Sequence, residues 1–218
     1  MRMRTLAAWL AASGFCAAAA FGQQGAGLTA KVGTLGVGGD LTLGLGSQLN
    51  LRGGYNWFSY DRTVSLNEAD LDGTLDMGTL PVLLDWHLFG GGFRISGGMV
   101  LNNNEVRLTT EPGTVLELDG QPFRVDSVDG RVTFDDYAPY AGIGYGNAIG
   151  KDGQWHFSCD FGVLFQGEPK VEPTAKASNP SAQSALSRAL QKEVDDYQDD
   201  IKNFAYWPVI SVGLSYRF

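Results

Sequence analysis

The stretch WHFSCDFGVLF, residues 155–165, decides the fold class. Its odd positions are all apolar, whereas its even positions hold His156, Ser158, Asp160, Gly162 and then Leu164. Successive side chains of a β-strand point to opposite faces, so this two-residue period predicts a strand with one apolar and one polar face. Leu164 is the exception, because it is an apolar residue on the polar face.

The same alternation recurs along the rest of the chain. It predicts further strands at residues 35–45, 49–57, 80–86, 93–104, 132–148 and 206–218. A soluble β-sandwich also alternates, but here the polar faces are rich in glycine, as a narrow wet lumen requires, and aromatic residues lie near both ends of the apolar faces, as in the girdles of a membrane barrel. These aromatic residues are Trp57, Trp86, Trp155, Phe165, Tyr206 and Tyr216. We therefore expect an all-β fold, an antiparallel transmembrane β-barrel.

The connections between these strands alternate in length. Short ones lie at residues 46–48, 89–92 and 150–153, and long ones at 61–70, 109–130 and 167–203. Short periplasmic turns and long outer loops are typical of outer-membrane barrels, which normally have an even number of strands. Seven strands are clear, so we expect eight, with the remaining one formed where the N-terminal stretch folds back near Gly36–Gly39.

The first residues predict the compartment. Arg2 and Arg4 precede an apolar run at residues 6–20, and small residues follow it. This pattern predicts a signal peptide at residues 1–22, followed by a single outer-membrane barrel at residues 23–218. The mature chain would contain one cysteine, Cys159, which excludes an internal disulfide and any multi-cysteine metal site. We expect no metal and no cofactor.

The charge balance excludes one class of function. Removing Arg2 and Arg4 from the 16 basic residues leaves 14 against 24 acidic ones, a net charge of −10. A nucleic-acid-binding protein needs a basic surface, so we expect no nucleic acid partner. The long segments 61–76, 105–131 and 168–202 have net charges of −4, −3 and −2. We expect this acidic rim to face the exterior and to repel lipopolysaccharide phosphates unless divalent cations bridge them.

Several short motifs resemble those of small Gram-negative outer-membrane barrels. They are TLGVG at 34–38, LDWH at 84–87, FRISGG at 93–98 and the closing GLSYRF at 213–218. The chain resembles an uncharacterised family of such proteins, similar to the eight-stranded OmpA- and OmpW-type barrels, over nearly all of its mature length. The resemblance implies that Tyr216 and Phe218 belong to a signal read by the barrel-assembly machinery. It also implies contact with outer-membrane lipid and lipopolysaccharide, but no activity.

One segment breaks the β pattern. Residues 168–180 contain three prolines, which predicts a linker, and Asn179–Pro180 then predicts the start of a helix that ends near Phe204. Its apolar stripe consists of Leu186, Leu190, Val194, Tyr197, Ile201 and Phe204. We consider two interpretations of this amphipathic helix at about residues 180–204: a lid packed on loop residues, or a docking face for a partner or lipopolysaccharide.

Three charged residues are candidates for a lumen cluster. Arg52, Asp85 and Arg94 lie on the polar faces of three consecutive strands, near the short turns. Pairing across the turn at 89–92 brings Asp85 towards Arg94, and Arg52 comes from the strand on the other side. The interior of an eight-stranded barrel is just wide enough for side chains to fill it, which favours direct pairing over charges hydrated in an open channel. We expect Asp85→Ala to destabilise the barrel more than Arg52→Ala, because Arg94 would remain.

A catalytic site has little support. His156 and Ser158 have the H-x-S spacing of outer-membrane lipid A deacylases, but they lie on the polar face beside a periplasmic turn, away from the outer leaflet. We therefore predict no catalytic residues and a non-enzymatic barrel with a plugged or very narrow lumen, in a structural or surface-binding role. The alternatives are a narrow channel for small or apolar solutes and a hydrolase similar to the lipid A deacylases.

Overall fold

The computed structural model describes residues 25–218 except 67–68, 111–112, 119–120 and 152, so the predicted signal peptide lies outside the described residues. The strands are β1 Ala26–Gly33, β2 Gly36–Gly44, β3 Leu49–Leu66, β4 Ala69–His87, β5 Phe93–Asn102, β6 Glu105–Thr110, β7 Val115–Leu118, β8 Gln121–Thr133, β9 Tyr137–Tyr145, β10 Trp155–Phe165, β11 Lys170–Ala177 and β12 Tyr206–Arg217. The helices are the α-helix α2 Gln183–Ile201 and the 3₁₀ turns η1 Leu88–Gly90, η2 Pro180–Ala182 and η3 Lys202–Ala205.

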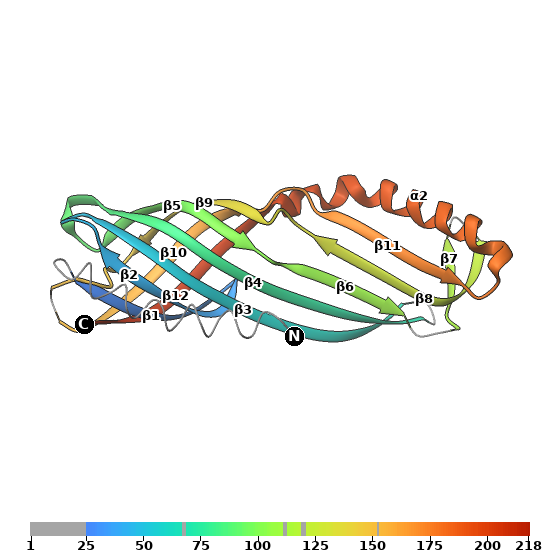
Figure 1. Cartoon of the computed structure of the whole chain (residues 1–218), viewed down its shortest axis with the longest axis horizontal. Coiled ribbons are helices and arrows are strands. Elements are labelled where there is room, and N and C mark those ends of the chain that lie inside the picture. The colour runs from blue at the N-terminus through green and yellow to red at the C-terminus, as the bar shows by residue number, and fades with distance from the viewer. Residues whose placement is uncertain (1–24, 67–68, 111–112, 119–120, 152) are drawn as a thin grey trace.

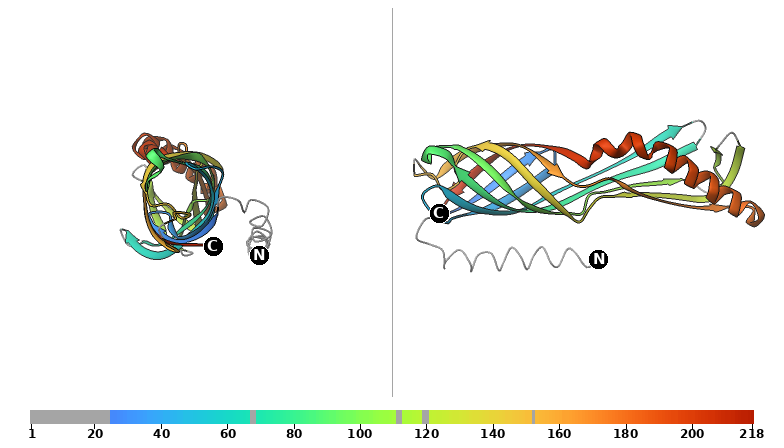
Figure 2. Two further views of the ribbon diagram at one scale, coloured as in Figure 1. Left: turned by 90° about the vertical axis from the view of Figure 1, so that its left-hand side faces the viewer. Right: turned by 90° about the horizontal axis from the view of Figure 1, so that it is seen from above.

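Eight of these strands form a closed antiparallel barrel (Figures 1 and 2). They pair in the order β1, β2, β3, β4, β5, β9, β10 and β12, and β12 pairs with β1 to close the ring. The predicted all-β class and the number of eight strands are confirmed. The N-terminal stretch folds back at Thr34 and Leu35, slightly before the predicted position. Gly36 follows this turn with φ +94° and packs against the backbone of Trp57, a position that only glycine fits.

The barrel wall is apolar outside and polar inside. The outward side chains of the alternating strands are exposed, including the predicted girdle residues Trp57, Trp86 and Trp155. At the end that holds the C-terminus, Tyr216 contacts Trp155 and Phe218 edge-on, with ring centroids 5.0 and 5.6 Å apart. At the opposite end, the Phe165 and Tyr206 rings are 5.7 Å apart. An apolar outer belt between two sets of aromatic residues is the surface of a transmembrane barrel.

The segments 61–70 and 109–130, predicted as long loops, are mostly strands, and 167–203 contains a strand besides the predicted helix, so the prediction of loops there was wrong. The hairpin of β3 and β4 continues beyond the barrel until Leu66 pairs with Ala69. Beyond the barrel, residues 71–76 of β4 pair with β6, β6 pairs with β8, and β8 pairs with both β11 and β7. We call this sheet beyond the barrel the extension (Figure 1). The predicted linker at 168–180 contains β11, which tolerates Pro173 because it is an edge strand and needs no N–H donor on its free side.

The predicted helix is present as η2, α2 and η3. The Asn179 side chain caps it by accepting the Ser181 N–H at 3.1 Å. Leu186 is fully buried against Phe123, Val125 and Ala177 of the extension. Figure 1 shows α2 running along the extension beside β11, so it packs on residues of the predicted loops, as the first interpretation expects, but does not lie across the barrel mouth. Within the described ranges, no helix combines the length and the apolar character needed to cross a membrane.

Candidate functional site in the barrel lumen

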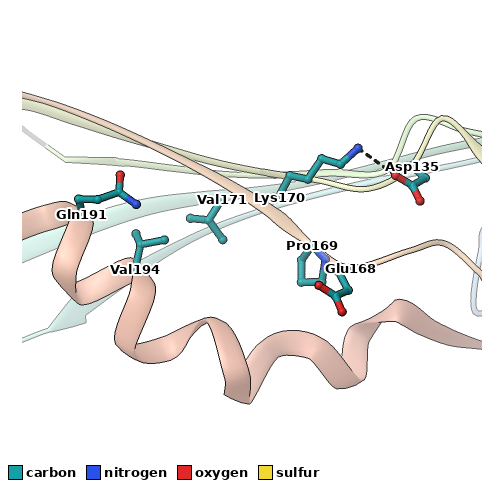
Figure 3. Close-up of a pocket in the computed structure, with 7 residues that line it drawn as sticks. All are labelled: Asp135, Glu168, Pro169, Lys170, Val171, Gln191 and Val194. Carbon is teal, nitrogen blue, oxygen red and sulfur yellow. Dashed lines mark hydrogen bonds and ion pairs between the residues drawn. The ribbon is translucent and has the colours of Figure 1, made fainter.

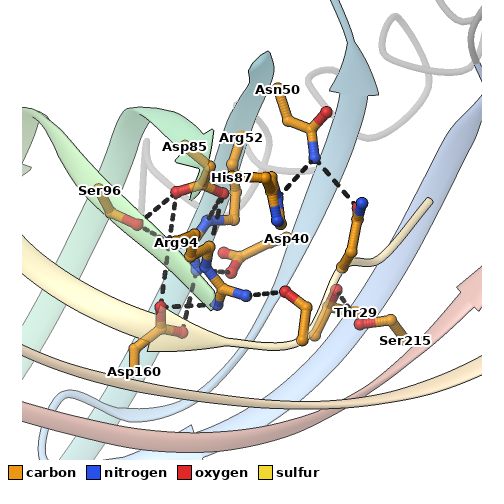
Figure 4. A network of polar contacts seen from close by, with 12 residues as sticks. Thr29, Asp40, Asn50, Arg52, Asp85, His87, Arg94, Ser96, Asp160 and Ser215 are labelled. Atoms are coloured by element: carbon orange, nitrogen blue, oxygen red, sulfur yellow. Dashed lines mark hydrogen bonds and ion pairs between the residues drawn. The ribbon is translucent and has the colours of Figure 1, made fainter. Parts of the chain in front are cut away.

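Six charged side chains meet inside the barrel, and Figure 4 labels all of them except Lys31. Three are basic and three acidic, and each side chain is at most 12% exposed. Arg52 lies at their centre: its Nε is 2.9 Å from Asp85 Oδ2, and its Nη1 is 3.1 Å from Asp160 Oδ2 and 3.5 Å from Asp40 Oδ2. One guanidinium group therefore contacts all three carboxylates.

The two other cations complete the cluster. Arg94 Nη2 is 2.7 Å from Asp160 Oδ1, and its Nη1 donates to the Gly146 carbonyl. Lys31 Nζ is 2.8 Å from Asp40 Oδ1. Buried charges are costly unless they are paired, and here three positive charges balance three negative ones.

The structure brings Arg52, Asp85 and Arg94 together. The carboxylate that contacts both guanidinium groups closely, however, is that of Asp160 and not that of Asp85. Arg94 Nε is 3.9 Å from Asp85, whereas Asp160 contacts both guanidinium groups at 3.1 Å or less. Asp160 and Asp40 lie on polar faces, so their alternation already directs them into the lumen. Their contacts with Arg52 cross the lumen, and the pairing of neighbouring strands does not reveal such contacts.

Glycines provide the space for these large side chains. A Cβ at Gly144 would lie 2.8 Å from Asp160 Oδ1 and 2.9 Å from Arg94 Nε. A Cβ at Gly142 or Gly162 would lie 2.5 Å from the Tyr140 hydroxyl. The glycine-rich polar faces therefore accommodate large side chains in the lumen.

The side chains that point into the lumen lie in layers. Towards the C-terminal end lies a polar layer, in which Asn50 Nδ2 is 3.0 Å from His87 Nε2 and the Thr29 and Ser215 hydroxyls are 2.8 Å apart. The cavity left among the polar layer and the charged cluster is about 10 Å³, the room of about one water molecule.

On the other side of the cluster lies an apolar layer. It comprises Leu83, Val100, Ala138, Tyr140, Leu164 and Val209, with Leu35 and Trp207 packed against them. Leu164, the exception in the alternation, belongs to this layer. Amides follow towards the extension, where Asn56 donates to Thr79 at 2.9 Å and Asn104 to Gln166 at 3.3 Å.

The remaining predicted residues lie at the C-terminal end of the barrel. His156 Nε2 is 3.1 Å from the Gly153 carbonyl, and the described interactions include no hydrogen bond between His156 and Ser158. Tyr216 and Phe218 lie in the aromatic contacts at the barrel end, where the Phe218 N–H donates to the Ala26 carbonyl at 2.9 Å.

A second cavity lies outside the lumen, between α2 and the start of β11 (Figure 3). Its volume is about 500 Å³, and Pro169, Val171 and Val194 contribute apolar surface to it. At its rim Lys170 Nζ donates to Asp135 Oδ1 at 2.9 Å, and this hydrogen bond raises the pKa of Lys170.

The fold is similar to those of two solved proteins. The crystal structure of Acinetobacter baumannii CarO2 has a TM-score of 0.59 and 24% sequence identity, covering 89% of this chain and 98% of that chain. The crystal structure of Acinetobacter baumannii CarO has a TM-score of 0.55 and 22% identity, covering 88% and 97%. No protein-family model and no curated protein sequence matches the chain. At these identities the similarity shows a shared fold.

Proposed function

We propose that this protein is a non-enzymatic outer-membrane barrel with a plugged lumen, whose extension binds a ligand or partner at the cell surface. The observation that carries the proposal is the lumen filling: a charge-balanced cluster and an apolar layer lie in series. An apolar constriction opposes the passage of ions because water leaves it readily. The cavity beside the cluster, of about 10 Å³, has the room of about one water molecule, which supports a plugged lumen.

The outer membrane as the location is supported by the apolar belt with its two aromatic sets and by the terminal strand that ends in Phe218. Outer-membrane lipid and lipopolysaccharide would contact the belt, and the barrel-assembly machinery would act on the terminal strand. The likeness to the OmpA and OmpW barrels stays a prediction.

Conductance in planar bilayers tests the plugged lumen. The wild-type protein is expected to show no steady conductance. Asp85→Ala alone should also stay closed, because the apolar layer remains. Asp85→Ala combined with Tyr140→Ala should conduct, since it opens both layers. A stable, large conductance of the wild type would contradict the proposal and favour a channel.

The second candidate is a narrow channel for small or apolar solutes. The apolar layer favours it over an ion channel, because Leu83, Leu164 and Val209 offer no polar contact to a hydrated ion. Uptake of small apolar and small polar solutes into liposomes that contain the protein distinguishes the two candidates. Uptake above that of empty liposomes would support the channel.

The absence of enzymatic activity is tested separately. Lipid A is incubated with the wild-type protein and with His156→Ala, and released acyl chains are measured. We expect no release from either protein. Release by the wild type that His156→Ala abolishes would identify a hydrolase.

A further inference from the structure

The two faces of the extension differ in polarity, in the opposite sense to the barrel. On the outer face of the β3–β4 hairpin beyond the barrel, the Ser59 hydroxyl donates to Asp76 and the Thr63 hydroxyl donates to Asp72, at 2.7 Å each. Phe58 and Tyr60 point to the inner face, the face continuous with the lumen, and their rings stack with centroids 6.4 Å apart. The extension is thus polar outside and apolar inside.

The strand register aligns one apolar residue from each of five strands on this inner face. Tyr60 pairs with Leu75, Leu75 with Val106, Val106 with Val132, and Val132 with Val171. We call these five residues the apolar row. With strands about 4.8 Å apart, the row is ~19 Å long, and Phe58, Met77 and Leu108 lie beside it on the same face.

The helix covers only part of this face. Leu186 packs on Val125 and Ala177, with Val128 and Ala175 beside them, so α2 lies on the inner face of β8 and β11. On β3 and β6 part of the face is exposed, since Phe58 is 39%, Tyr60 52% and Leu108 43% exposed, whereas Met77 of β4 is buried. Where the row ends at Val171, the cavity of about 500 Å³ separates it from Val194 of α2 (Figure 3).

We infer that the apolar row and this cavity bind a single extended acyl chain. The row has the length of a long fatty-acyl chain, and it ends at Val171, which lines the cavity together with Pro169, Val194 and the polar side chains of Glu168, Lys170 and Gln191. The cavity volume lies in the ordinary range for small-molecule sites. The inference rests on the surface-binding role proposed above and specifies its ligand.

The bound acyl chain would lie across the strands of the extension and would not enter the barrel lumen. The amide groups of Asn56, Asn104 and Gln166 lie between the row and the apolar layer of the barrel. An acyl chain that crossed this level would leave amides without their hydrogen bonds, which is costly in an apolar environment. The site therefore holds its ligand at the outer end of the protein.

Photocrosslinking tests the site. The full mature protein in lipid nanodiscs is irradiated with palmitate that carries a diazirine at its chain end, and the labelled peptides are mapped. We expect saturable labelling of β4, β8 and β11 that excess palmitate removes. A second arm uses a phosphatidylethanolamine with the diazirine on one acyl chain, which distinguishes a free fatty acid from a lipid as the source. Labelling of this face by either probe supports the site.

Two pairs of variants provide the controls. Leu75→Asn, in the row, should weaken saturable labelling about tenfold or more, because it removes apolar contact and adds an unpaired amide. Thr74→Asn, its neighbour on the outer face, should leave labelling unchanged. Val171→Asn and Thr174→Asn form a second pair on β11 if Leu75→Asn fails to fold, as judged by heat-modifiable migration.

The inference is overturned if labelling is not saturable, if it is confined to the outward face of the barrel, or if both members of a pair behave alike. A result that contradicts the proposed plugged lumen can be distinguished from these outcomes. Wild-type conductance reports on the lumen alone, and crosslinking reports on the extension alone.

Discussion

Replacing Arg52 by methionine tests the charged cluster most directly, because methionine keeps much of the length of the side chain and removes its charge. Arg52 contacts all three carboxylates. Without it, Asp85 still accepts a hydrogen bond from the Ser96 hydroxyl at 2.6 Å, but its nearest remaining cation among the described residues is Arg94, at 3.9 Å, and the cluster has one excess negative charge. Removing one partner of a buried ion pair costs about 3–5 kcal/mol, so we expect Arg52→Met to lower the free energy of unfolding by about that amount.

The geometry reverses the order expected from the sequence. In Asp85→Ala, Arg52 keeps Asp160 and Asp40, so this variant should cost less than Arg52→Ala. In Arg94→Met, every carboxylate keeps Arg52, so the cost should again be smaller. The double variant Arg52→Met with Asp85→Asn restores charge balance and should recover part of the loss, which a double-mutant cycle measures as coupling.

Urea unfolding of the barrel in lipid vesicles, followed by tryptophan fluorescence and heat-modifiable migration, gives these free energies. The reasoning would be refuted if Arg52→Met were as stable as the wild type. It would also be refuted if Asp85→Ala were the more destabilising change, since Arg52 would then not be the central partner.

Three further predictions concern packing and assembly. Gly142→Ala should cost about 1–3 kcal/mol in the same unfolding assay, because its Cβ would lie 2.5 Å from a tyrosine hydroxyl, whereas Gly53→Ala, with no atom within 4 Å of its Cβ, should be neutral. Deleting Phe218 should reduce the heat-modifiable, membrane-inserted protein more than its synthesis, and equal inserted yields would argue against an assembly signal there. Leu186→Ala should weaken the packing of α2 on the extension by about 2–5 kcal/mol of free energy, and so speed proteolysis of the helix without unfolding the barrel. Replacement of its exposed neighbour, Ser187→Ala, should leave the rate of proteolysis unchanged.

The barrel could be predicted because an apolar outer face and a polar inner face impose an unbroken two-residue period. The capped helix could be predicted for a similar local reason, since Asn179 and Pro180 define its start. The helix packing could not, because its contacts use small residues: Ala182, Ala185 and Ala189 flank Leu186 against the sheet. Alanine contributes little to an apolar stripe in a sequence, although it allows a helix to approach a sheet closely.

The candidate site was predictable only in part. The alternation directs Asp40 and Asp160 into the lumen as clearly as it does Arg52. Contacts between neighbouring strands follow from the turns, which is why Asp85 and Arg94 could be brought together. Contacts across the lumen depend on how the ring closes, because β10 meets β3 only through the interior.

The extension was missed because the alternation changes phase where the strands leave the barrel. Along β3 the outward residues are apolar up to Trp57, whereas beyond it the inward residues Phe58 and Tyr60 are apolar and the outward residues Ser59 and Asp61 are polar. On β4 the change lies between inward Met77 and outward Leu80. The period of two continues, but apolar residues move from one face to the other, so a pattern search ends each strand there. That same change of phase marks the edge of the lipid: below it the outer face meets hydrocarbon, and above it the outer face meets water while the inner face needs an apolar partner.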